Sequence, residues 1–121
     1  MFESVQLPQS VIDAFHLMWD GFPEPVQLNH KSRRIMAVNK AAAAMGLAPN
    51  LFCNKLGTPE QHRGCKANQC VATGQAQYVP IQKPGHEAVG FWLPVDGYPE
   101  FFIHFGVGVS MNYKTGEKEP L

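Results

Sequence analysis

Residues 25–46 read PVQLNHKSRRIMAVNKAAAAMG, a stretch with two strand-like runs followed by a helix-like one. The run Pro25–Asn29 is extended in character, and Ile35–Val38 follows it after a polar turn, as in a strand–turn–strand unit. Asn39 then precedes four alanines, and Gly46 follows them. Because Asn caps helix N-termini and Gly accepts the left-handed backbone beyond a helix C-terminus, a short helix is predicted between them.

An amphipathic helix is predicted upstream of this unit. Its apolar positions recur at helical spacing, namely Val11, Ile12, Phe15, Met18 and Trp19. An apolar stripe of this kind must be buried against another surface. The sequence leaves two surfaces open, the chain's own sheet and a second copy of the chain.

The chain downstream of Gly46 changes from short helices to strands. Helical turns are predicted near residues 49–52 and 59–62, and a helix over Lys66–Thr73 is closed by Gly74. Three strand-like runs follow, at Gln77–Ile81, Ala88–Val95 and Glu100–Val109. The polar residues 112–121 are expected to fray.

Length and charge exclude several classes of protein. The 121 residues fit one domain, and ten Lys and Arg balance ten Asp and Glu, which argues against a nucleic-acid partner. The basic run Lys31–Arg34 is interpreted as a solvated turn. No apolar run approaches the ~18 residues of a membrane span, and the N-terminus has no signal-peptide pattern. We therefore expect a cytoplasmic protein without a membrane partner, whose cysteines are thiols or metal ligands.

The order of these elements, and three of their motifs, resemble a PAS domain. GFPEPVQL at Gly21–Leu28 is similar to the opening motif of that family, and RIMAVNKAA at Arg34–Ala42 is similar to the motif that follows. Cys65–Gly74, with Ala76, resembles a bacterial variant that has cysteines near its last helix. The similarity extends over roughly residues 10–111.

This resemblance implies an α+β fold. Its sheet has five antiparallel strands in the order 2-1-5-4-3, with short helices on one face and the amphipathic helix at the N-terminus. Residues 1–121 would form a single PAS-like domain, with a core at about 10–111 and a polar tail at 112–121.

The resemblance also implies a function. A PAS domain acts as a sensory and protein-interaction module in signal transduction, so a small ligand or a redox cue would be sensed in the cleft between helices and sheet. The N-terminal helix would form a homodimer, and a signalling protein would be the partner. Alternate strand residues share a face. The expected cleft residues are Phe91, Phe101, Ile103 and Phe105, with His104 on the opposite face, bonded within the sheet or lining a cavity.

All three cysteines fall within residues 53–74, together with one histidine. Cys53, His62, Cys65 and Cys70 are spaced C-x8-H-x2-C-x4-C. Four soft ligands can hold zinc or an iron–sulfur cluster, so a metal-based redox sensor is one alternative. A switch in which two thiols form a disulfide is another. The third is that Cys70 is a small core residue and the others are incidental.

Cofactors and catalysis have weaker support in the sequence. PAS domains that carry haem often use a histidine of the last helix, and Lys66–Thr73 contains none, although Cys70 offers a thiolate. Haem, a metal and an iron–sulfur cluster are therefore not favoured, and the cofactor is unknown. No nucleophile elbow, phosphate loop or HExxH motif is present, so no enzyme is expected. A small enzyme that uses Cys65 with His62 is the remaining alternative.

Overall fold

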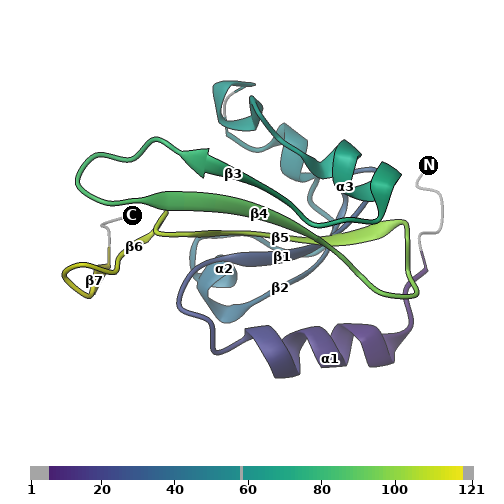
Figure 1. The fold of residues 1–121 in the computed structure, drawn as a ribbon. Helices are drawn as coiled ribbons and strands as arrows, with labels where there is room; N and C mark the ends of the chain where they lie inside the picture. The colour runs from purple at the N-terminus through teal and green to yellow at the C-terminus, as the bar shows by residue number, and fades with distance from the viewer. Residues whose placement is uncertain (1–5, 58, 119–121) are drawn as a thin grey trace.

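A five-stranded antiparallel sheet lies between two layers of helices (Figure 1). The computed structural model describes residues 6–57 and 59–118. The helical elements are α1 (Gln9–Trp19), α2 (Lys40–Ala44), the 3-10 turns η1 (Cys53–Lys55) and η2 (Pro59–His62), and α3 (Ala67–Thr73). The strands of the sheet are β1 (Val26–His30), β2 (Ile35–Val38), β3 (Gln77–Ile81), β4 (Ala88–Pro94) and β5 (Phe101–Val107). Two short strands, β6 (Met111–Asn112) and β7 (Glu117–Lys118), form a separate hairpin.

The strand order is β2-β1-β5-β4-β3, and every neighbouring pair is antiparallel, which confirms the predicted α+β fold. Strand β5 lies at the centre, where its register pairs Ile103 with Leu28 of β1 and with Leu93 of β4. In the described part of the chain, no helix is long and apolar enough to cross a membrane.

Helix α1 packs on one face of the sheet, on the side opposite to α3 (Figure 1). Phe15 is its buried residue, and it packs with Val26, Leu28 and Phe101 of the sheet. The apolar stripe therefore covers the chain's own sheet, one of the two surfaces left open by the sequence. Met18 was expected on that stripe but is 74% exposed, because it lies on the solvent side of the helix beside Leu17, which is 85% exposed.

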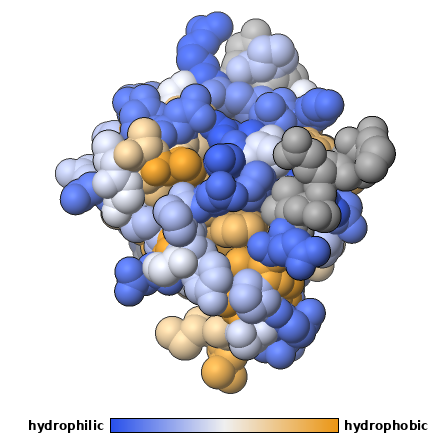
Figure 2. Space-filling view, turned by 90° about the vertical axis from the view of Figure 1, so that its right-hand side faces the viewer, coloured by the Kyte–Doolittle hydropathy of each residue, from blue (hydrophilic) through white to orange (hydrophobic). Residues whose placement is uncertain are grey.

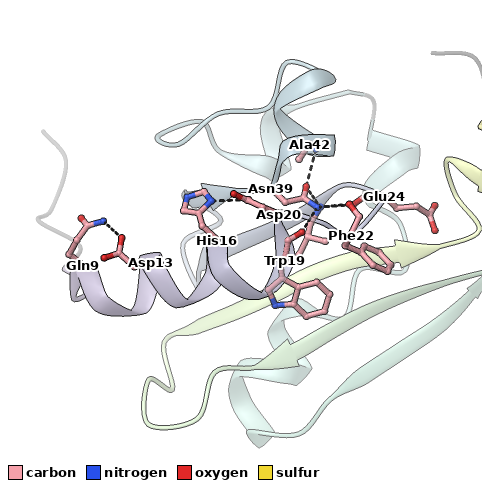
Figure 3. A network of polar contacts seen from close by, with 10 residues as sticks. Gln9, Asp13, His16, Trp19, Asp20, Phe22, Glu24, Asn39 and Ala42 are labelled. Carbon is pink, nitrogen blue, oxygen red and sulfur yellow. Dashed lines mark hydrogen bonds and ion pairs between the residues drawn. The ribbon is translucent and has the colours of Figure 1, made fainter.

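A buried polar network connects α1, β1 and α2 (Figure 3). Asn39 caps α2 as predicted, because its Oδ1 accepts from Ala42 N at 3.0 Å and also from Val26 N at 2.9 Å. Its Nδ2 donates to the carbonyl oxygens of three residues in the α1–β1 connection, Trp19, Phe22 and Glu24. Asn39 is fully buried, and its hydrogen bonds hold the end of α1 and the α1–β1 connection in place against β1 and α2.

The Glu24 side chain continues the network to the C-terminal segment. Its carboxylate is fully buried and accepts hydrogen bonds from Gly108 N at 2.7 Å, Ser110 N at 2.7 Å and Tyr113 OH at 2.8 Å. Gly108 has φ +84°, and a Cβ there would lie 2.1 Å from the Glu87 carbonyl oxygen, so a glycine is required. Within the tail that is expected to fray, residues 112–118 belong to the β6–β7 hairpin, and residues 119–121 lie outside the described residues.

Candidate functional site

A cleft of about 920 Å³ lies between the sheet and the helical segment that runs from η1 to α3. Its floor is formed by alternate residues of three strands, with Gln27 and Asn29 on β1, and Phe102 and His104 on β5. Trp92 continues the floor on β4. This volume is in the range of small-molecule sites in proteins, so the cleft is the candidate functional site.

The four expected cleft residues lie elsewhere. Phe101, Ile103 and Phe105 belong to the core beneath α1, and Phe91 stacks on Phe105 with ring centroids 5.2 Å apart. The cleft face of β5 carries Phe102 and His104 instead. Both faces of this strand carry a phenylalanine, and the polar His104 is the residue that distinguishes the cleft face from the apolar face under α1.

Two polar atoms at the cleft are buried without a hydrogen-bond partner in the described part of the protein. They are Asn29 Oδ1 and Trp92 Nε1, on side chains that are 0% and 5% exposed. The Asn29 Nδ2 donates to Gln27 Oε1 at 3.1 Å, so only the acceptor end of this amide is unpaired. Buried polar atoms normally have partners, and an unpaired one requires an explanation such as a ligand.

His104 presents an acceptor to the cleft. Its Nδ1 donates to the Phe91 carbonyl oxygen at 2.9 Å, which leaves Nε2 as the acceptor nitrogen of the neutral ring. Burial lowers the pKa of His104, the hydrogen bond to Phe91 opposes that shift, and the positive charge of Arg33 adds to it, so the ring is neutral at pH 7. The Trp92 ring stacks on the His104 ring at 4.7 Å, with 13° between their planes.

The cysteine segment is divided between the cleft and the core. Cys53, His62 and Cys65 all line the cleft, and the Cys65 thiol is close enough to affect the ionisation of Cys53. Burial raises the pKa of the Cys53 thiol, and the neighbouring Cys65 raises it further, whereas Arg33 opposes the shift. Cys70 lies instead in the core beneath α3 with Phe102, and burial raises the pKa of its thiol as well.

The predicted ligand set is therefore not brought together. Among residues 6–57 and 59–118, no three His, Cys, Asp or Glu side chains are grouped closely enough to hold a metal ion. All three cysteines are free thiols. His62 Nε2 donates to the Leu56 carbonyl oxygen, which leaves Nδ1 as the acceptor nitrogen of the neutral ring.

Arg33 is a cleft residue that the sequence did not identify. The basic run at 31–34 was interpreted as a solvated turn, but Arg33 lines the cleft and lies over the Phe102 ring, 5.7 Å from its centroid. Its φ of +79° is rare for a residue with a side chain. That backbone conformation, which a sequence does not reveal, directs one basic residue of the turn over the sheet.

Solved structures share this architecture at low sequence identity. The PAS domain of BvgS from Bordetella pertussis superposes with a TM-score of 0.61 at 15% identity, covering 88% of this chain and 91% of that one. The chain has the PAS fold. A sensory box sensor histidine kinase from Vibrio cholerae gives a TM-score of 0.58 at 11% identity, covering 87% and 98%.

A domain of an HTR-like protein from Haloarcula marismortui also matches, with a TM-score of 0.51 at 19% identity over 69% of this chain and 95% of that one. No protein-family model matches the sequence, and no curated protein matches it either. The PAS fold is therefore established through structure, and the cleft described above lies between its sheet and its short helices.

Proposed function

We propose that this PAS fold is a sensory module in signal transduction, which binds a small molecule in the cleft and passes the change to a partner protein. The observation that carries the proposal is the cleft of about 920 Å³ itself, which is lined by aromatic and apolar side chains with a few polar groups. Two of its lining residues, Asn29 and Trp92, each hold a buried polar atom without a partner in the described chain, and a ligand would pair with these atoms once the side chains turn toward it. Binding, rather than catalysis, is the role that these groups support.

The direct test is native mass spectrometry of the protein as purified from cells. We expect a bound small molecule whose mass is retained by the native protein and lost on denaturation. Gly90→Leu is the cleft-blocking variant, because a Cβ at Gly90 already lies 3.3 Å from Ile81 Cδ1 and 3.6 Å from the Trp92 ring. Gly21→Leu is its matched control, since a Cβ at Gly21 meets nothing within 4 Å.

Loss of the bound mass in Gly90→Leu, with retention in Gly21→Leu, would support the cleft as the site. Equal occupancy in the two variants would place the ligand elsewhere and contradict the proposal. Circular dichroism and urea unfolding of both variants would separate a filled cleft from a failure to fold.

A redox cue is the second candidate, because Cys53 and Cys65 line the same cleft and the Cys65 thiol affects the pKa of Cys53. Oxidation by peroxide would join the two sulfur atoms in a disulfide, with loss of two protons and two electrons to the oxidant. Peptide mapping after mild peroxide treatment would detect the Cys53–Cys65 link. Oxidation confined to a sulfenic acid on the exposed Cys65 would count against the switch.

The solvent side of α1 is the surface that we propose for association. Leu17 and Met18 are 85% and 74% exposed, and Figure 2 shows hydrophobic atoms on the lower side of the molecule, where α1 lies. Burying these side chains in a homodimer would remove apolar area from water. Sedimentation of the native chain and of Leu17→Ser/Met18→Ser tests this, and a native monomer would contradict it.

A further inference from the structure

The side chains that line the cleft carry charge of one sign. Arg33 and Arg63 are both among them, and no aspartate or glutamate belongs to the described residues of the lining. The whole chain has equal numbers of acidic and basic residues, so this imbalance is a local arrangement. A cleft lined by one sign of charge within low-dielectric walls concentrates ligands of the opposite sign.

The Arg33 guanidinium is held by two hydrogen bonds and has further N–H donors that are not used by them. Its NH1 donates to the Lys31 carbonyl oxygen at 2.7 Å, and its NH2 donates to Asn68 Oδ1 on α3 at 2.7 Å. Both acceptors are neutral, and no carboxylate of the described chain forms an ion pair with Arg33. Three of the five N–H donors remain, in the planar fork that matches a carboxylate.

The rest of the cleft suits an apolar, flat molecule that carries a few polar atoms. The Phe102 ring lies beneath Arg33, and the parallel rings of Trp92 and His104 lie farther along the floor. Aliphatic side chains complete the lining, namely Leu47, Leu56, Val79, Ile81 and Val109. Asn29 and Trp92 also line the cleft, and each holds a buried polar atom without a partner in the described chain, an acceptor on Asn29 and a donor on Trp92.

We propose that the ligand of the cleft is an organic anion, an aromatic carboxylate whose charged end pairs with Arg33 and whose ring lies along Phe102 and Trp92. This inference rests on the proposed function, because it names the chemical class of the molecule sensed there. A carboxylate would neutralise the one arginine that is held over the floor, and its ring would cover apolar surface in the same site.

The opposing explanation is that Arg33 is purely structural and connects the β1–β2 turn to α3 through its hydrogen bonds to Lys31 and Asn68. In that case Arg33 contributes to the free energy of unfolding and not to binding. Replacing it would then lower the free energy of unfolding and leave unchanged the preference of the cleft for charged over neutral molecules. The two explanations therefore differ in a measurable binding ratio.

The experiment uses pairs of probes that differ only in charge. Benzoate, naphthalene-2-carboxylate and indole-3-acetate are each compared with the matching primary amide, by calorimetry and by quenching of tryptophan fluorescence at pH 7. For the native chain, we expect at least one acid to bind about 10- to 100-fold more tightly than its amide, the usual range for a charge-assisted hydrogen bond.

Two variants assign that preference to Arg33. Arg33→Gln should abolish the preference for the acid, and Arg33→Lys should retain part of it, because the charge remains but the fork is lost. Lys31→Gln is the control, since it removes the same charge from the same turn at a side chain outside the cleft lining. It should leave the preference unchanged.

The outcomes separate this inference from the proposed function. Equal binding of acids and amides, in a way that Gly90→Leu blocks, would overturn the anion and leave the cleft as a ligand site. If neither acids nor amides bind, the inference falls, and the proposed function is then decided by whether the purified protein carries a small molecule that Gly90→Leu loses. A preference that persists in Arg33→Gln would also overturn the inference, because it would place the charge recognition elsewhere.

Discussion

Two buried asparagines, Asn29 and Asn39, lie ten positions apart in the sequence and differ in how their side chains are paired. Both are 0% exposed. The Asn39 side chain makes five hydrogen bonds to backbone groups, whereas Asn29 Oδ1 has no partner in the described chain. A fully paired buried amide holds a fold together, whereas an unpaired buried atom requires an explanation. The contrast sets the paired network between α1, β1 and α2 against the floor of the cleft.

The largest effect is expected at Asn39. Asn39→Leu keeps the number of side-chain atoms but leaves two backbone N–H groups and three carbonyl oxygens without this partner. We expect the free energy of unfolding to fall by about 3 kcal/mol or more, from the lost cap and the unpaired buried groups. Urea unfolding measures it. Asn54→Leu, an exposed control, should change the same quantity by less than about 0.5 kcal/mol.

Glu24 should give the next largest effect. In Glu24→Gln an amide N–H₂ replaces one carboxylate oxygen, and it faces donors on Gly108, Ser110 or Tyr113. We expect a loss of about 2 kcal/mol, together with faster hydrogen exchange at the Gly108 and Ser110 amides. Glu87→Gln, at an exposed side chain, is the control. Unchanged exchange at both amides would show that the carboxylate does not hold the C-terminal segment.

Tyr113 adds a pH dependence to the same network. Burial, the hydrogen bond to Glu24 and the negative charge of Glu24 raise the pKa of Tyr113 from 10.0 to about 12. Because the folded state holds this proton more tightly, the contribution is fully present below pH 10 and is lost as pH rises through about 12. Unfolding of the native chain and of Tyr113→Phe should differ at pH 8 and converge at high pH. A constant difference would contradict this.

The smallest effect is expected in thiol labelling, which compares the reactivity of the cysteines in the cleft with that of the core cysteine. Cys65 is exposed, whereas burial raises the pKa of Cys53 and Cys70 and lowers their thiolate fraction at pH 7. We expect iodoacetamide to modify Cys65 first. A molecule bound in the cleft should slow Cys53 and Cys65 without affecting Cys70, as peptide mass spectrometry would detect. Equal labelling rates at Cys65 and Cys70 would contradict the placement of Cys65 in the open cleft and of Cys70 in the core.

The sequence was most informative where local chemistry determines structure. The Asn39 cap and the Gly74 end of α3 follow from residues whose backbone preferences are strong, whereas the strand order was predicted from the resemblance to the PAS family. The choice of sheet face for the cleft did not follow, because Phe101 and Phe102 are equally apolar neighbours on β5. Hydrophobic alternation defines two faces but does not say which one a helix will cover.

Arg33 and Glu24 illustrate a second limit. Each acquires its role from a partner distant in the sequence, Asn68 for Arg33 and residues 108–113 for Glu24. Local patterns identify caps and turns, but such pairings depend on tertiary packing. The cysteine segment shows the same limit, because its spacing does not say that Cys53, His62 and Cys65 line the cleft while Cys70 lies in the core.

The most direct test of the account is to unfold Asn29→Leu and Asn39→Leu in urea, side by side and without ligand. The two substitutions are chemically identical and both sites are fully buried. We predict that Asn29→Leu changes the free energy of unfolding by less than about 1 kcal/mol, because it removes an unpaired acceptor and only the side-chain hydrogen bonds to Gln27 and Cys53, while Asn39→Leu loses about 3 kcal/mol or more. Equal losses at the two sites would mean that the cleft asparagine is part of the fold rather than part of a binding site.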